Sequence, residues 1–280
     1  LGNGRYVVFS EGLPPTRNDF SSRALVSADF NNDGIADFAA ASEGEWEKKN
    51  AGCKYGAMIC LGSPNGFECR LIADEKKMKG FYADQIVTGD VNGDGNVDIG
   101  IASLQHMLDL IVWLGDGKGG FTPFNHGLPT ELHYLSVALI DLNQDGRDDL
   151  VASITGFGRD GMKSVKAYVS EKNGFKDMSN GLPDKEVFFA VAGGDLDGDG
   201  IPEIVGGTAS GGVKIFALKN GMWRQAATPE LPETGLETIY NVYCVDVNGD
   251  GFDDVALNYA DGKSGAGGIR VYLSVPRQAE

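Results

Sequence analysis

Short apolar runs of strand length recur along the chain in pairs, and one polar loop separates the members of each pair. The runs that lead into the loops are 24–28, 85–89, 136–140, 190–194 and 241–245. The runs that leave the loops are 38–42, 99–103, 150–154, 204–208 and 255–259. Because these runs are short and show no helical period, the pattern predicts β-strands on both sides of each loop.

Each unit continues with a third apolar run and a glycine-containing turn, after which a fourth strand begins. The third runs are 57–61, 110–114, 165–169, 213–218 and 269–273. Four antiparallel strands per unit are typical of a propeller blade. The units recur every 51 to 61 residues, which is the range of periods that indicates blades, solenoid units or arrays.

The two ends of the chain complement one another. Residues 1–14 match residues 114–129, which hold the end of a third strand, a turn and a fourth strand, whereas residues 273–276 follow directly on a third strand. We therefore predict an all-β chain with one domain over residues 1–280. It is a five-bladed β-propeller of four-stranded antiparallel blades, and the N-terminal segment completes the last blade and closes the ring. The alternative is a longer protein with more blades.

The polar loops share the nine-residue pattern Asp-x-(Asn/Asp)-x-Asp-Gly-x-x-(Asp/Glu), at 29–37, 90–98, 141–149, 195–203 and 246–254. Calcium takes six to eight oxygen ligands, and this spacing offers side chains at positions 1, 3, 5 and 9 and a carbonyl at position 7. The glycine at position 6 permits the sharp turn. An EF-hand would close with Glu at position 12 and carry flanking helices, and neither feature is present. A plain polar turn is the alternative interpretation of a single copy, and five copies in one register make it a minor one.

We predict that about five calcium ions bind these loops. The expected ligands at positions 1, 3, 5, 7 and 9 are Asp29, Asn31, Asp33, Ile35 and Asp37; Asp90, Asn92, Asp94, Asn96 and Asp98; Asp141, Asn143, Asp145, Arg147 and Asp149; Asp195, Asp197, Asp199, Ile201 and Glu203; and Asp246, Asn248, Asp250, Phe252 and Asp254. Without metal these clustered carboxylates repel one another, so folding is expected to depend on calcium.

The net charge of −16 and the pI near 4.5 argue against nucleic acid or an anionic membrane as a partner. No apolar stretch is long enough for a membrane span. Weak calcium sites stay loaded at extracellular calcium levels, so we expect an extracellular or cell-surface protein, with the periplasm as a further possibility. Cys60 and Cys69 flank a turn and are expected to form a disulfide. Cys53 and Cys244 either pair or stay buried as thiols.

The repeated pattern resembles the FG-GAP/VCBS repeat, which occurs in the propeller of integrin α subunits, in some fungal lectins and in many secreted bacterial proteins. Elements similar to those that name the repeat are partly present at Gly156-Phe157-Gly158 and Gly265-Ala266-Gly267. The resemblance implies a calcium-bound β-propeller, and the partial motifs favour a secreted protein of the bacterial VCBS type. One fold hosts many functions, so the resemblance does not name a partner.

No catalytic motif stands out: the chain holds no Gly-x-Ser-x-Gly elbow, no His-Glu-x-x-His and no P-loop. We therefore expect a non-catalytic module that binds a protein or a carbohydrate, or a subunit of a larger surface assembly. The candidate ligand-binding residues are expected in loops on the face opposite the calcium loops, with ordinary packing or solvation as the alternative. They are Trp46, His106, His133, Phe157, Tyr240 and Tyr259.

The alternative function is a polysaccharide-active enzyme, a lyase or a hydrolase, with its site on that same face. Its candidate basic residues near the central channel are Arg17, Lys54 and Arg159.

Overall fold

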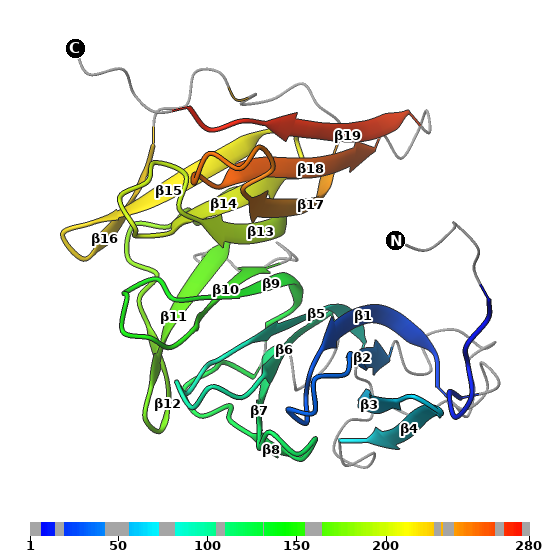
Figure 1. Cartoon of the computed structure of the whole chain (residues 1–280). Helices are drawn as coiled ribbons and strands as arrows, with labels where there is room; N and C mark the ends of the chain where they lie inside the picture. Colours follow the sequence, from blue (N-terminus) through cyan, green and yellow to red (C-terminus); the bar gives the residue numbers. More distant parts are fainter. Residues whose placement is uncertain are drawn as a thin grey trace.

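Five antiparallel β-sheets follow one another along the chain in this computed structural model (Figure 1). The structure describes residues 7–14, 20–42, 56–72, 82–104, 110–130, 132–154, 164–226, 231, 238–260 and 266–275. These residues form nineteen strands and no helix. The predicted all-β class is confirmed.

Every sheet begins with an inner strand and adds its other strands in sequence order. The first strands are β1 (Ser22–Ala28), β5 (Ala83–Gly89), β9 (Tyr134–Ile140), β13 (Phe188–Gly194) and β17 (Thr238–Val245). The second strands are β2 (Asp37–Ser42), β6 (Asp98–Ser103), β10 (Asp149–Ile154), β14 (Glu203–Thr208) and β18 (Asp254–Ala260). The third strands are β3 (Ala57–Ser63), β7 (Leu110–Gly115), β11 (Val165–Glu171), β15 (Val213–Lys219) and β19 (Gly267–Tyr272). The fourth strands are β4 (Gly66–Leu71), β8 (Phe121–Pro123), β12 (Gly174–Asp177) and β16 (Met222–Gln225).

The first strands contact one another in the order β1, β5, β9, β13 and β17, so they line the axis and the sheets radiate from it as blades. This arrangement is a five-bladed β-propeller, as predicted. All the strands of a blade come from one stretch of the chain, so its hairpins and loops join strands that are consecutive in sequence.

The second strand of a blade is the most deeply buried. Every residue of β6, β10 and β14 is buried, because these strands are hydrogen-bonded on both edges and covered by neighbouring blades on both faces. The tight fit explains the small residues in these runs. At Gly206, for example, an added Cβ would lie 2.5 Å from the Phe188 ring.

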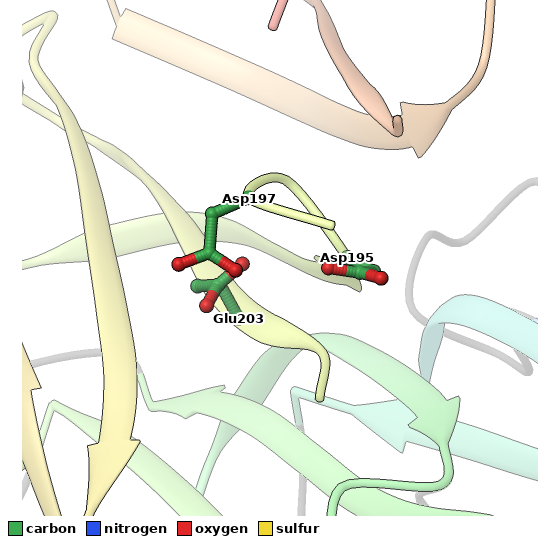
Figure 2. A group of neighbouring side chains, drawn as sticks. All are labelled: Asp195, Asp197 and Glu203. Carbon is green, nitrogen blue, oxygen red and sulfur yellow. The ribbon is translucent and has the colours of Figure 1, made fainter. Parts of the chain in front are cut away.

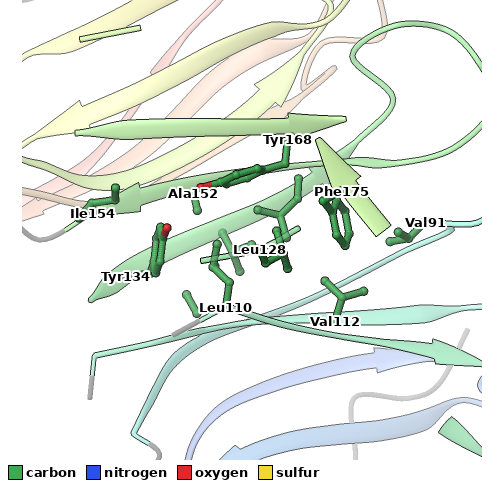
Figure 3. Packing of buried hydrophobic residues seen from close by; sticks show 12 residues of the cluster. Val91, Leu110, Val112, Leu128, Tyr134, Ala152, Ile154, Tyr168 and Phe175 are labelled. Atoms are coloured by element: carbon green, nitrogen blue, oxygen red, sulfur yellow. The ribbon is translucent and has the colours of Figure 1, made fainter. Parts of the chain in front are cut away.

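Neighbouring blades share four apolar cores. In the core between the second and third blades, Leu110 and Val112 of β7 face Tyr134 of β9 and Tyr168 of β11 (Figure 3). A fifth, smaller cluster lies within the first blade and the segment that precedes it. Because the four larger cores each join two blades, the stability of a blade depends on its neighbour.

A Gly-Leu-Pro turn follows the outer strands of the second and third blades, at 127–129 and 181–183, and the same triplet stands near the N-terminus at 12–14. The Phe175 N–H donates to the His126 carbonyl at 2.8 Å, and the Trp223 N–H donates to the Asn180 carbonyl at 2.9 Å. The Phe67 N–H donates in the same way to the Glu11 carbonyl at 2.8 Å. The N-terminal turn thus docks on the first blade as the equivalent turns dock on the third and fourth blades.

The closure of the ring by the N-terminal segment stays a prediction. Among the described residues the last sheet has three strands, and residues 7–9 form no strand. Val7 and Val8 are 90% and 92% exposed, as is most of the Ile269 side chain on β19. Residues 1–6 lie outside the described residues.

The predicted disulfide is confirmed: Cys60 of β3 and Cys69 of β4 are directly opposite each other across the hairpin and are joined. Cys244 carries a free thiol, and burial raises its pKa far above the usual range. Cys53 lies outside the described residues.

We expect that replacing both Cys60 and Cys69 by Ser lowers the free energy of unfolding by roughly 2–3 kcal/mol, because the bridge closes a loop of about ten residues in the unfolded chain. Thermal melts with and without reductant provide the measurement. Reductant should lower the melting temperature of the unchanged protein and leave that of the double variant where it is. Equal melting temperatures for all samples would show that the bridge adds no stability.

Candidate metal-binding loops

The five loops fold around the side chain at position 1. In the first loop, Asp29 accepts the Gly34 N–H at 2.7 Å, and Asp33 accepts the Ile35 N–H at 2.8 Å. The bonds from position 6 to position 1 and from position 7 to position 5 recur in all five loops. Backbone donors therefore surround the exposed acids, and they lower the pKa of Asp29 and of Asp246.

Two positions of every loop adopt left-handed backbone. Position 6 has φ between 80° and 91° at Gly34, Gly95, Gly146, Gly200 and Gly251. This confirms the reason given for glycine there. Position 4 is also left-handed, with φ between 58° and 79°, at Asn32, Gly93, Gln144, Gly198 and Gly249. This second turn was not predicted from the sequence, although the restriction of position 4 to Gly, Asn and Gln is the signal that reveals it.

The acid at position 9 ties each loop to the blade. Asp37 accepts the Phe30 N–H of its own loop at 2.8 Å and the Gly62 N–H of β3 at 2.6 Å. Asp98, Asp149 and Asp254 make the same two kinds of bond, and Glu203 accepts the N–H of Leu196. Each of these five acids is buried, and the position that closes the predicted site is therefore also the corner between three strands.

Burial raises the pKa of several of these acids. The pKa of Asp98 rises to about 6, and the pKa values of Asp149 and Glu203 rise to about 7. Desolvation is the main cause, and the neighbouring loop carboxylates add to it. A cation bound among these groups would offset both effects.

The fourth loop brings three acids closest together (Figure 2). One carboxylate oxygen from each of Asp195, Asp197 and Glu203 lies within 4.8 Å of the other two. Carboxylate, amide and carbonyl oxygens are hard ligands, and a set made only of them suits calcium better than a transition metal. The donor set of the loops thus fits the predicted ion.

The third loop departs from the others at its centre. In the first, second and fifth loops the Asn at position 3 donates from Nδ2 to the Asp at position 5. In the third loop Arg147 donates from Nη2 to Asp145 at 2.5 Å. A guanidinium therefore already occupies one oxygen of a predicted ligand there.

The acid at position 8 joins the loops of neighbouring blades. Asp148 accepts the Asp90 N–H at 2.8 Å and donates its own N–H to the Asp90 carbonyl at 2.7 Å. Asp253 makes the same pair of bonds with Asp195, at 3.0 Å and 2.9 Å. We call these two pairs the aspartate latches. Each latch fixes the backbone of the position 1 residue in the preceding loop.

A glycine makes room for each latch. A Cβ on Gly89 would lie 2.4 Å from the Asp148 carboxylate, and one on Gly194 would lie 2.6 Å from that of Asp253. The sequence analysis missed the latches. Two signals in the sequence pointed to them. A glycine precedes the second and fourth loops, and the loop of the following blade has an acid at position 8. This two-blade pattern repeats after 105 residues, from 90 to 195 and from 141 to 246.

The candidate ligand-binding residues do not share one kind of position in the fold. Tyr240 and Tyr259, which were expected in loops, lie in β17 and β18, so this placement was wrong. β17 begins two residues before Tyr240, and β18 ends one residue after Tyr259. His133 directly precedes β9, as predicted, and is partly buried. Trp46, His106 and Phe157 lie outside the described residues.

A family model described as an FG-GAP-like repeat matches residues 90–152 and 195–257. Each matched stretch begins at the first Asp of one loop and ends in the second strand of the next blade, and it therefore contains one aspartate latch. No curated protein matches the chain.

We expect Asp148→Ala to lower the free energy of unfolding by about 1–3 kcal/mol, because the Asp90 N–H loses its acceptor in a partly buried site. Asp253→Ala should have a similar effect. The matched control is Asp184→Ala, which removes an equal charge from an exposed position and should change stability by less than about 0.5 kcal/mol. Thermal melts at one fixed calcium concentration make the comparison, and equal melting temperatures for the Asp148 and Asp184 variants would contradict the role of the latch.

Proposed function

Because this chain belongs to the FG-GAP-like repeat proteins, we propose that it is an extracellular, calcium-stabilised propeller that acts as a non-catalytic binding or structural module. The observation that carries the proposal is the buried acid at position 9, which recurs in all five loops and joins each loop to its blade. We infer that the five blades act as one domain, and that a protein or a carbohydrate, or a larger surface assembly, is the partner.

In the proposed sites the chain supplies side-chain oxygens from positions 1, 3, 5 and 9 and the carbonyl of position 7. A bound calcium ion would neutralise carboxylates that the fold places side by side. The Asx-type bonds already hold positions 1, 3 and 5 on one side of each loop, so little ordering remains to be done on binding. The ion would thus stabilise the folded chain and not the unfolded chain.

The five proposed sites are not equal. The fourth loop, with four acids, should bind calcium most tightly, because its carboxylates already lie together without a competing cation. The third loop should bind most weakly, because the Arg147 guanidinium pairs with Asp145. The five loops have the same backbone shape, so their charges are expected to decide the order of their calcium affinities.

Two features support a location outside the cell. The disulfide between Cys60 and Cys69 is typical of oxidising compartments. Loops of this open, exposed kind match the weak calcium sites of extracellular modules. Among the described residues no helix is long and apolar enough to cross a membrane.

The polysaccharide-active enzyme was predicted on Arg17, Lys54 and Arg159, which all lie outside the described residues. The geometry of the described residues adds no support to that alternative.

Removal of calcium is expected to lower the melting temperature by about 10 °C or more. A site filled at a hundred times its dissociation constant adds about 2.7 kcal/mol to folding, and several such sites act together. Melts in calcium, in excess chelator, and in chelator followed by added calcium are the measurement. An unchanged melting temperature in chelator would overturn the proposed calcium role.

The order of the sites can be tested with charge variants. Asp195→Asn combined with Asp197→Asn should remove one calcium ion per chain, as counted by elemental analysis after dialysis. Arg147→Ala should tighten the weakest site in a calcium titration, because it frees Asp145 for the ion. The control is Asp184→Asn, which lies outside the loops and should leave the count unchanged. If Arg147→Ala leaves the weakest site as it was, the proposed order is wrong.

A further inference from the structure

A β-bulge recurs at the same place in the first strand of every blade. The pairing of first and second strands skips one residue between Ser22 and Ala24, and the same shift occurs in each of the other four blades. The skipped residues are Arg23, Asp84, Leu135, Phe189 and Tyr240, and each stands six positions before the first Asp of its loop. We call these five residues the mouth ring.

The mouth ring lies at one end of the central axis. The first strands contact one another in the order β1, β5, β9, β13 and β17, so residues at one register form an arc from the first blade to the fifth. At about 3.3 Å per residue, the ring is about 20 Å from the first aspartates of the loops, at the opposite end of the inner strands. Bulges re-aim side chains and are frequent at barrel rims and beside binding sites.

One half of the mouth ring is a polar pair. Arg23 of the first blade approaches Asp84 of the second, with 2.7 Å between Nε and Oδ1. The same guanidinium contacts the hydroxyl group and the ring face of Tyr82. The Asp84 side chain is only 8% exposed, whereas that of Arg23 is 43% exposed. The guanidinium thus presents donors to solvent from a position held by Asp84 and Tyr82.

The other half of the mouth ring is an aromatic pair. Phe189 of the fourth blade and Tyr240 of the fifth meet edge to face, with ring centroids 5.6 Å apart. Tyr240 is 44% exposed, whereas Ile239 and Val242 of the same strand are buried in the apolar core. Leu135 of the third blade stands between the two pairs in the order of the ring.

We propose that the mouth ring binds a neutral oligosaccharide. This inference rests on the proposed function, since it names the site and the ligand class of a binding module. A sugar ring has apolar C–H faces, which stack on aromatic side chains, and hydroxyl groups, which accept from a guanidinium and donate to a carboxylate. The polar pair supplies the second kind of contact at one end of the arc, and the aromatic pair supplies the first kind at the other end.

The charges of the ring favour a neutral ligand. Arg23 and Asp84 cancel each other, so the mouth ring has no net charge of its own. The chain as a whole carries a charge of −16, which disfavours uronates and other anions. A cationic ligand would have to displace Arg23 from the buried Asp84. A ligand that touches both pairs must span different blades, so several sugar units are needed.

Isothermal titration of the calcium-loaded full chain is the test, with neutral tetrasaccharides to hexasaccharides of glucose, xylose and N-acetylglucosamine as probes and a hexauronate for comparison. We expect at least one neutral probe to bind and the hexauronate to bind at least tenfold more weakly. Tyr240→Ala should weaken the neutral probe by at least tenfold. Tyr243→Ala is the matched control, because Tyr243 lies on the same strand, is 59% exposed and is outside the ring. The affinity of this variant for the neutral probe should equal that of the unchanged protein.

Arg23→Ala should also weaken binding at least tenfold, and circular dichroism and a melt in calcium establish that each variant is folded. If Arg23→Ala does not fold, Tyr240→Ala and Phe189→Ala carry the test alone. The proposal is overturned if no neutral probe binds at millimolar concentration, or if a probe binds and Tyr240→Ala matches Tyr243→Ala. Neither result changes the calcium response of the melting temperature, so failure of the mouth ring is distinguishable from failure of the proposed module.

Discussion

The buried carboxylate at position 9 of each loop is the interaction on which the rest of the structure depends. It stands at the first residue of the second strand, and it accepts one N–H from its loop. In four blades it also accepts one from the end of the third strand. Such a group loses water on folding and is favourable only when its charge is compensated. The proposed calcium ion would compensate this charge at the same contacts that turn the corner of the blade.

This constraint acts on pairs of blades as well as on single ones. The aspartate latches hold the first residue of the second and fourth loops from the blade that follows, and the apolar cores are also shared between neighbours. The repeating unit of the central part of the chain is thus two blades with one latch. Any change in one loop is expected to reach the loop beside it, because the two share a pair of backbone hydrogen bonds.

The two ends of the inner strands have different tasks. At the loop end the five blades repeat the same backbone and nearly the same oxygens, as the proposed structural calcium sites would require. At the other end they repeat the same bulge with five different side chains, an arginine, an aspartate, a leucine and two aromatic residues. A constant backbone with variable side chains is the usual form of a binding surface on a rigid scaffold.

The sequence by itself determined the strands, the loops, the blade count and the bridge between Cys60 and Cys69, because each depends on residues that are close along the chain. Apolar runs of strand length, a nine-residue oxygen pattern and a turn between two cysteines are all local. The tertiary structure alone decided the latches, the pairing of Arg23 with Asp84, and the contact of Phe189 with Tyr240. These join residues 51 to 61 positions apart on different blades. Their meeting depends on the register of each inner strand and on the bulge within it, which no local pattern specifies.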